Sequence, residues 1–74
     1  MTRLPPLSGA ELVRRLRRFG YEIDRQTGSH IILRHADAPH RRITVPNHKT
    51  IAKGTLRAIL RHAQISVEEI IRRS

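Results

Sequence analysis

One histidine in this chain stands near elements that could bind phosphate. His30 ends the run Gly28-Ser29-His30, and a basic stretch begins at His48, soon after Pro46. An imidazole has an ordinary pKa of about 6.5, so it can accept a proton and return it near neutral pH. Cleavage of RNA through its own 2′-hydroxyl requires such a base beside cations that hold the phosphate. The spacing makes His30 a candidate general base.

The β-branched and apolar residues of 29–34 predict a strand that carries this histidine. Alternation places His30 and Arg34 on one face of the strand and Ile31 and Leu33 on the other. If the apolar face packs on helices, the two polar side chains point together toward solvent. Arg34 could then neutralise charge that develops on a phosphate. An exposed strand histidine is most often an ordinary surface residue, so the pattern alone leaves both interpretations open.

A second group of cations follows on a predicted helix. Lys53 and Arg57 are four residues apart and therefore share one helix face, while His48 and Lys49 lie in the loop before it. The free amides of a helix start favour a phosphate, and Gly54 would let it approach closely. The stripe is a candidate cradle for an RNA backbone. A solvated face of an amphipathic helix has the same spacing.

Charge narrows the class of partner without naming it. Fifteen Lys and Arg residues against six acidic residues give a formal net charge of +9. RNA, DNA, an acidic protein and an anionic membrane would all be attracted to such a field. All but two of the cations are Arg, whose planar guanidinium suits bidentate contacts with phosphate.

Composition excludes several kinds of chemistry. The chain has no cysteine, which excludes thiol catalysis, disulfides and Cys-based zinc sites and fits a reducing cytoplasm. The five histidines show no HExxH pairing, so we expect neither a metal nor another cofactor. No apolar stretch approaches the ~18 residues of a membrane span, and residues 1–6 lack the apolar core of a signal peptide.

Periodicity and capping signals predict an α+β domain over residues 1–74 with the order α-β-β-β-α and a short terminal helix. Capping boxes are expected at Ser8–Glu11 and Ser66–Glu69. The first helix is predicted over 9–19 and ends at Gly20, a C′ residue. The strands are predicted over 21–25, 29–34 and 41–45, the second helix from 53–55 onward and the last helix to about 73. The apolar face of the second helix is predicted to comprise Ala52, Leu56, Ile59, Leu60 and Ala63.

DNA reading and base stacking are both poorly supported. The last two helices could pass for a helix-turn-helix, but the reading helix would present Glu68 and Glu69 to DNA. We therefore expect no direct sequence-specific DNA binding by this chain alone. Phe19 and Tyr21 are the only aromatic residues, and Phe19 is predicted to lie in the core. RNA contacts should run through phosphate and sugar, with weak sequence preference.

Several segments together resemble, in order and spacing, the HicA family of toxin mRNA interferases. The resemblance covers residues 7–72, and its specificity comes from the Gly-Ser-His and Gly-Thr-Leu-Arg elements together. The matching segments are 12–20, 28–30, 45–48, 54–60 and 66–69.

The resemblance implies a fold similar to the double-stranded-RNA-binding domain, with a three-stranded antiparallel sheet flanked by helices. It implies mRNA cleavage without a metal, with the family's catalytic histidine at His30. It also implies a HicB-like antitoxin that covers the active site and often binds operator DNA. Family members often carry a second histidine directly after the first, where this chain has Ile31. Alternation turns Ile31 inward, so the assignment of His30 is little affected.

Residues and resemblance together predict a cytoplasmic toxin ribonuclease in which His30 is the general base. They do not identify the general acid, and His48 is considered for it only because it lies near the basic loop. The residues expected to contact RNA are Ser29, Arg34, His48, Lys49, Lys53 and Arg57. Two other classes fit the residues alone. One is a non-catalytic RNA-binding module of the same fold, and the other is an interaction protein whose basic surface serves only an acidic partner.

Overall fold

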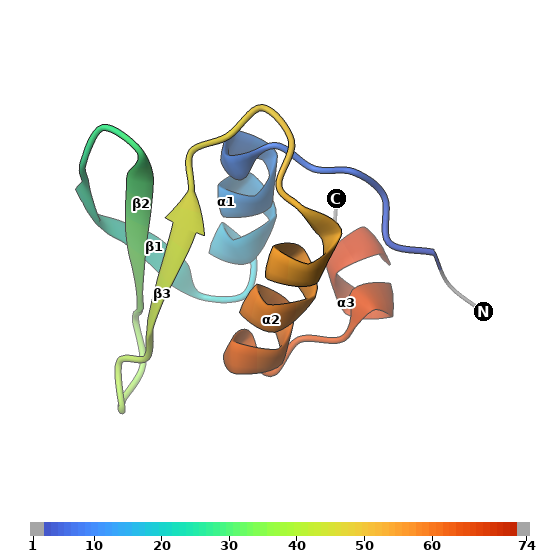
Figure 1. Cartoon of the computed structure of the whole chain (residues 1–74). Coiled ribbons are helices and arrows are strands. Elements are labelled where there is room, and N and C mark those ends of the chain that lie inside the picture. Colours follow the sequence, from blue (N-terminus) through green and yellow to red (C-terminus); the bar gives the residue numbers. More distant parts are fainter. Residues whose placement is uncertain (1–2, 73–74) are drawn as a thin grey trace.

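Residues 3–72, which the computed structural model describes, form one sheet and three helices (Figure 1). The order is α1 (Gly9–Arg17), β1 (Tyr21–Gln26), β2 (His30–His35), β3 (Arg42–Pro46), α2 (Lys53–Ala63) and α3 (Val67–Arg72). The strands are antiparallel in the order β1-β2-β3. The predicted α+β class, strand number and element order are confirmed. The predicted end of the last helix near residue 73 lies outside the described residues.

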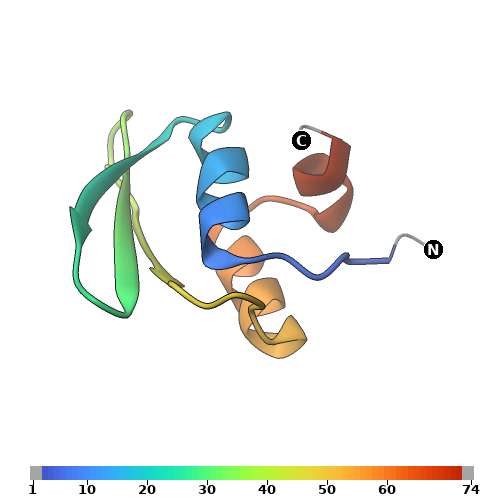
Figure 2. The same cartoon turned by 90° about the horizontal axis from the view of Figure 1, so that it is seen from above.

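The helices form two layers on one side of the sheet. α1 and α2 cover one sheet face, and α3 lies beyond them, on the side away from the sheet (Figures 1 and 2). Within residues 3–72, no segment covers the other sheet face. No helix in this range is long and apolar enough to cross a membrane.

Alternation along β2 sets which side chains enter the core. Ile31 and Leu33 are buried and stand opposite Val45 and Ile43 of β3, which are buried as well. Such apolar cross-strand pairs stabilise the sheet and fix its register, since a one-residue slip would expose them all. The predicted split of β2 into an apolar helix-facing side and a polar outer side is confirmed. The helices contribute most of the other core residues, including the fully buried Leu12, Leu16, Leu56 and Ile70, and the segments between elements add Leu4, Leu7, Ile51 and Ile65.

The edge strand β1 departs from regular alternation. Ile23 pairs with Leu33 and Arg25 pairs with Ile32, so Asp24 between them is an extra, bulged residue. A β-bulge shifts the side-chain alternation by one position. Only Tyr21 of this strand is buried. The prediction of a strand over residues 21–25 is confirmed, and the bulge changes which face the residues after Ile23 share.

Element ends differ from the sequence prediction by one or two residues. α1 stops at Arg17, because the next residues bond three positions back in a tighter turn: the Phe19 N–H donates to the Leu16 carbonyl at 2.9 Å. Gly20 then adopts φ +94°, as expected of a C′ glycine, and its missing Cβ leaves room for the His35 ring. β3 extends through Pro46, although the strand was predicted to end before that proline.

Ala52 was predicted to lie on the apolar face of the second helix, and this is wrong. It is the exposed N-cap of α2, one residue before the helix begins at Lys53. A residue at the cap is outside the helical repeat, so the spacing of the face does not apply to it. Leu56, Ile59, Leu60 and Ala63 form the buried face.

Both predicted capping boxes are present. The Glu11 N–H donates to the Ser8 hydroxyl at 3.0 Å, and the Ser8 N–H donates to the Glu11 carboxylate at 2.9 Å. Ser66 and Glu69 make the same pair of bonds before α3. Each box satisfies backbone donors that a helix start otherwise leaves unpaired.

Acidification should weaken the α1 cap through Glu11. Its pKa is lowered because its carboxylate accepts from the Ser8 backbone and stabilises the charged form, with Arg14 and Arg15 adding to the effect. A carboxyl whose folded pKa is depressed contributes stability above its unfolded pKa and loses it as the pH falls through the folded value. Urea unfolding of the wild type should therefore weaken from about pH 5.5 to about pH 3 more than that of Glu11→Gln. The control Glu22→Gln should keep the wild-type dependence; equal slopes for all three proteins would contradict this role of Glu11.

Candidate active site

The candidate base is exposed on the uncovered face of the sheet. His30 is the first residue of β2, and its partner across the sheet is Pro46, the last residue of β3. The Ser29 hydroxyl lies 3.2 Å from Nδ1 of the His30 ring. If Nδ1–H donates to that hydroxyl, Nε2 presents its lone pair to solvent. In this tautomer the imidazole is ready to accept a proton.

The main chain around His30 is held from both sides. The Thr27 N–H donates to the His30 carbonyl at 2.9 Å, which closes the turn between β1 and β2. On the other side, the Asn47 N–H donates to the Ser29 carbonyl at 2.9 Å, just past the end of β3. These bonds fix the main chain at the start of β2 and therefore the direction in which the Ser29 and His30 side chains point.

The start of α1 supports the same region from behind. The Gly9 N–H donates to the His48 carbonyl at 2.9 Å, and Gly9 is buried. A Cβ at Gly9 would collide with the Pro46 carbonyl oxygen, so only glycine allows this close approach. The starts of α1, β2 and α2 and the end of β3 all lie at one end of the molecule (Figure 1).

The histidines differ in what their rings do. The His35 ring lies 2.8 Å from the Phe19 carbonyl and accepts from the Asp37 N–H at 3.0 Å, so both nitrogens are used. The rings of His40 and His62 each lie 3.2 Å from a main-chain carbonyl. Among the described residues, the His30 ring has only the Ser29 hydroxyl as a partner. The ring of His48 makes no contact of this kind within residues 3–72.

Arg34 shares the uncovered face with His30, as predicted, but is not beside it. The two residues are four positions apart on β2, or about 13 Å at ~3.3 Å per residue. Arg34 is half-buried and stands opposite Glu22 on one side and Arg42 on the other. Arg42 pairs with Asp24 at 3.3 Å across the sheet. Arg34 therefore belongs to a mixed-charge cluster at some distance from the base.

Arg25 is a cation near His30 that the sequence analysis did not single out. Strict alternation would put it with Tyr21 and Ile23 on the helix side. The bulge at Asp24 instead pairs Arg25 with Ile32, on the same face as His30. A bulge has no clear signature in a single short strand, so this placement needed the structure.

The predicted basic stripe is exposed to solvent. His48 and Lys49 lie in the loop after β3, and Lys53 and Arg57 occupy the first two turns of α2. The Ala52 side chain cannot cap the free amides at the start of α2. The first turn of this helix, which the structure describes in full, contains no acidic residue. The end of the molecule that carries His30 thus also presents the basic start of α2.

Within residues 3–72, no three His, Asp or Glu side chains gather as metal ligands.

A family model described as the HicA toxin of bacterial toxin-antitoxin matches residues 9–65, most of the chain. This chain belongs to the HicA toxin family. The match runs from the start of α1 to Ile65 and includes the Gly-Ser-His run and the basic stripe. A search of curated proteins finds no match.

Membership in the HicA family confirms the resemblance read from the residues. It makes this protein a toxin of a toxin–antitoxin system, which implies an antitoxin partner. The interaction-protein alternative, in which the basic surface serves only an acidic partner, does not by itself account for a toxin.

Proposed function

We propose that this HicA-family toxin cleaves RNA, with His30 as the general base. The observation that carries the proposal is an exposed imidazole whose Nδ1 is held by Ser29 at 3.2 Å and whose Nε2 is left open to substrate. Nε2 removes the proton from a ribose 2′-hydroxyl, and the 2′-oxygen attacks the adjacent phosphorus. The bond to the 5′-oxygen breaks, leaving a 2′,3′-cyclic phosphate on one fragment and a 5′-hydroxyl on the other.

The departing 5′-oxygen needs a proton, and His48 is the candidate donor. Its main chain is one residue from Asn47, which bonds to Ser29, and its ring is uncommitted among the described residues. A protonated imidazole there would give its own proton to the 5′-oxygen, while His30 keeps the proton taken from the 2′-hydroxyl. His30 then loses a proton to water and His48 gains one, which restores the initial state.

The phosphates are held by groups around this end of the molecule. Ser29 can donate to the reacting phosphate, because its hydroxyl is next to the base. Arg34, about 13 Å from His30, serves a neighbouring phosphate rather than the reacting one. Lys49, Lys53 and Arg57 hold the strand beyond the sheet edge. An antitoxin of the HicB type with an acidic surface would inhibit by covering His30 and these cations.

Purified toxin incubated with single-stranded RNA should cut it, and one fragment should end in a cyclic phosphate. Activity should persist in a chelator, because no metal takes part in the proposed steps. An RNA with a single 2′-deoxynucleotide before a cleavage site should resist cutting at that site only. RNA that binds but stays intact would favour the alternative of a non-catalytic RNA-binding module.

Binding of RNA should depend strongly on salt. About four phosphate contacts on a single strand give a log–log slope near −3, at ~0.7 per contact. This can be measured with fully 2′-O-methylated RNA, which lacks the nucleophile. Lys53→Glu should make the slope shallower and weaken binding to different sequences about equally. Arg72→Glu makes the same charge change on α3, away from the sheet, and should leave the slope unchanged; the same slope for both variants would refute the cradle.

A further inference from the structure

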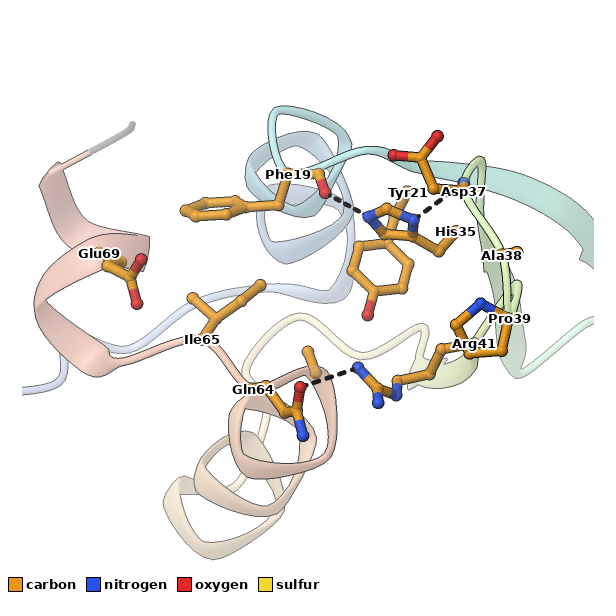
Figure 3. Close-up of a pocket in the computed structure, with 11 residues that line it drawn as sticks. Phe19, Tyr21, His35, Asp37, Ala38, Pro39, Arg41, Gln64, Ile65 and Glu69 are labelled. Carbon is orange, nitrogen blue, oxygen red and sulfur yellow. Dashed lines mark hydrogen bonds between the residues drawn. The ribbon is translucent and has the colours of Figure 1, made fainter.

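A cavity of about 290 Å³ lies at the other end of the sheet from His30 (Figure 3). It opens between the end of α1, the turn after β2 and the loop between α2 and α3. His30 and His35, which lines it, are at opposite ends of β2, about 16 Å apart at ~3.3 Å per residue. Its size is near the lower limit of ~300 Å³ for small-molecule pockets, which suits one planar group. Its apolar walls are Phe19, Tyr21, Pro39, Ala63 and Ile65.

Tyr21 turns an unpaired hydroxyl into this cavity. The residue is only 2 % exposed, and its ring stands edge-on to His35 with centroids 4.8 Å apart. The hydroxyl points toward the space between Ile65 and Arg41 (Figure 3). It makes no hydrogen bond to any described residue. No described side chain has a buried polar atom without a partner, so the Tyr21 hydroxyl is reachable from the cavity and can bond to a ligand there.

Two further polar side chains border the same space. Arg41 donates to the Gln64 side-chain oxygen at 3.4 Å, which leaves the Gln64 amide N–H groups and the other guanidinium donors for a ligand. Gln64 ends α2 with φ 60°, in the left-handed region that favours glycine. Glycine would suit this backbone conformation better, yet the chain has a glutamine here, whose amide side chain borders the cavity.

The charge of the lining argues against an anion as the ligand. The cavity is bordered by one cation, Arg41, and by two carboxylates, those of Asp37 and Glu69. This balance is unusual on a chain with net charge +9, whose open surfaces attract phosphate. A neutral planar group with both donors and acceptors fits better. Unpaired nucleobases have this chemistry, and proteins bind them by aromatic or Arg stacking and by edge hydrogen bonds.

From these observations we infer that the cavity binds an unpaired base of the RNA strand, a few nucleotides from the bond that is cut. The inference rests on the proposed function, since it assigns a specificity site to the same substrate. Both aromatic side chains of the chain line this cavity, although Phe19 was expected in the core. Phe19 is partly buried, packs against the core and also lines the cavity. A base site gives the toxin a sequence preference that phosphate contacts alone would not.

Free nucleosides test this site without phosphate and without cleavage. Adenosine, guanosine, cytidine and uridine are titrated into the full chain, and amide shifts are followed by NMR. At least one nucleoside should shift the amides of Tyr21, His35 and Gln64 in a saturable way. The amide of Thr44, on the uncovered sheet face, should not move.

Three variants separate the cavity from its surroundings. Tyr21→Phe removes one oxygen atom and should weaken nucleoside binding about two- to tenfold, as expected for one neutral hydrogen bond. Gln64→Gly removes the amide while suiting the backbone, so it should weaken binding in a stable protein. His40→Gly relieves the other left-handed non-glycine residue, φ 59°, next to the cavity but outside its lining, and should bind nucleosides normally.

The results of these titrations decide whether the cavity is a base site. No saturable shift, or equal binding by wild type, Tyr21→Phe and Gln64→Gly, would overturn it. It would also be overturned if the cavity bound a peptide of the antitoxin and no nucleoside. If nucleosides bind but RNA is never cut, the base site stands and the proposed cleavage fails. If RNA is cut equally at all sequences and nucleosides do not bind, the proposed cleavage stands and the base site fails.

Discussion

His30→Ala is expected to abolish RNA cleavage while leaving the fold and RNA binding largely intact. Loss of a general base costs on the order of 10²–10⁴ in rate. The side chain is exposed and bonds only to the Ser29 hydroxyl, so its truncation should change the free energy of unfolding by less than ~0.5 kcal/mol. Single-turnover cleavage of a labelled RNA measures the rate, and urea unfolding measures the stability. In cells, induction of the wild type should arrest growth, and induction of the variant should not.

Two further histidine variants make this result specific. His62→Ala removes another exposed imidazole, which lies on α2 and bonds to the Arg42 carbonyl. Because α2 covers the sheet face opposite to His30, this variant should cut at the wild-type rate. His48→Ala should slow cleavage if His48 is the general acid. A His30→Ala protein that still cleaves near the wild-type rate would rule out His30 as the base.

Local patterns predicted most of the fold because each had one dominant local cause. The capping boxes at Ser8 and Ser66 depend on residues three apart, and the structure has both. Alternation along β2 correctly separated Ile31 and Leu33 from His30, because this central strand has one buried face and no irregularity. The helix start near Lys53 was found from periodicity alone.

The features that the sequence did not reveal depend on contacts between distant segments. The bulge at Asp24 places Arg25 on the uncovered sheet face that carries His30. The pairing of β1 with β2 decides this placement, and the neighbours of Arg25 in the chain do not. The separation of His30 and Arg34 follows from the extended geometry of β2, although alternation puts both on one sheet face. The Tyr21 hydroxyl faces a cavity built by three separate segments, which no short motif encodes.

The five histidines illustrate the same limit. In the sequence they are equivalent titratable groups, spread over strands and turns. In the structure His35 is fixed by two main-chain partners, and its ring fills the space that Gly20 leaves free. That makes it a structural residue that joins the end of α1 to the turn after β2. Only the hydrogen-bond partners separate such a histidine from one available for catalysis.

Gly9→Ala should destabilise the protein and slow cleavage at the same time. The new Cβ would meet the Pro46 carbonyl oxygen and the Asn47 Cα at 3.1 Å, both main-chain atoms that cannot rotate away. Overpacking of this kind typically costs about 1–3 kcal/mol. That is a large share of the ~4–11 kcal/mol expected for a chain of this length. Urea unfolding measures the loss directly.

We expect Gly9→Ala to lose activity because the segment that must move to make room for the new Cβ supports His30. Pro46 stands opposite His30, and Asn47 bonds to the Ser29 carbonyl, so a shift of this segment moves the base and its hydroxyl partner. Gly28→Ala is the matched control, because it lies two residues from His30 and a Cβ there meets no described atom within 4 Å. It should change stability by less than ~0.5 kcal/mol and keep the cleavage rate. If Gly9→Ala were as stable and active as Gly28→Ala, the start of α1 would not be the support that holds the catalytic end in place.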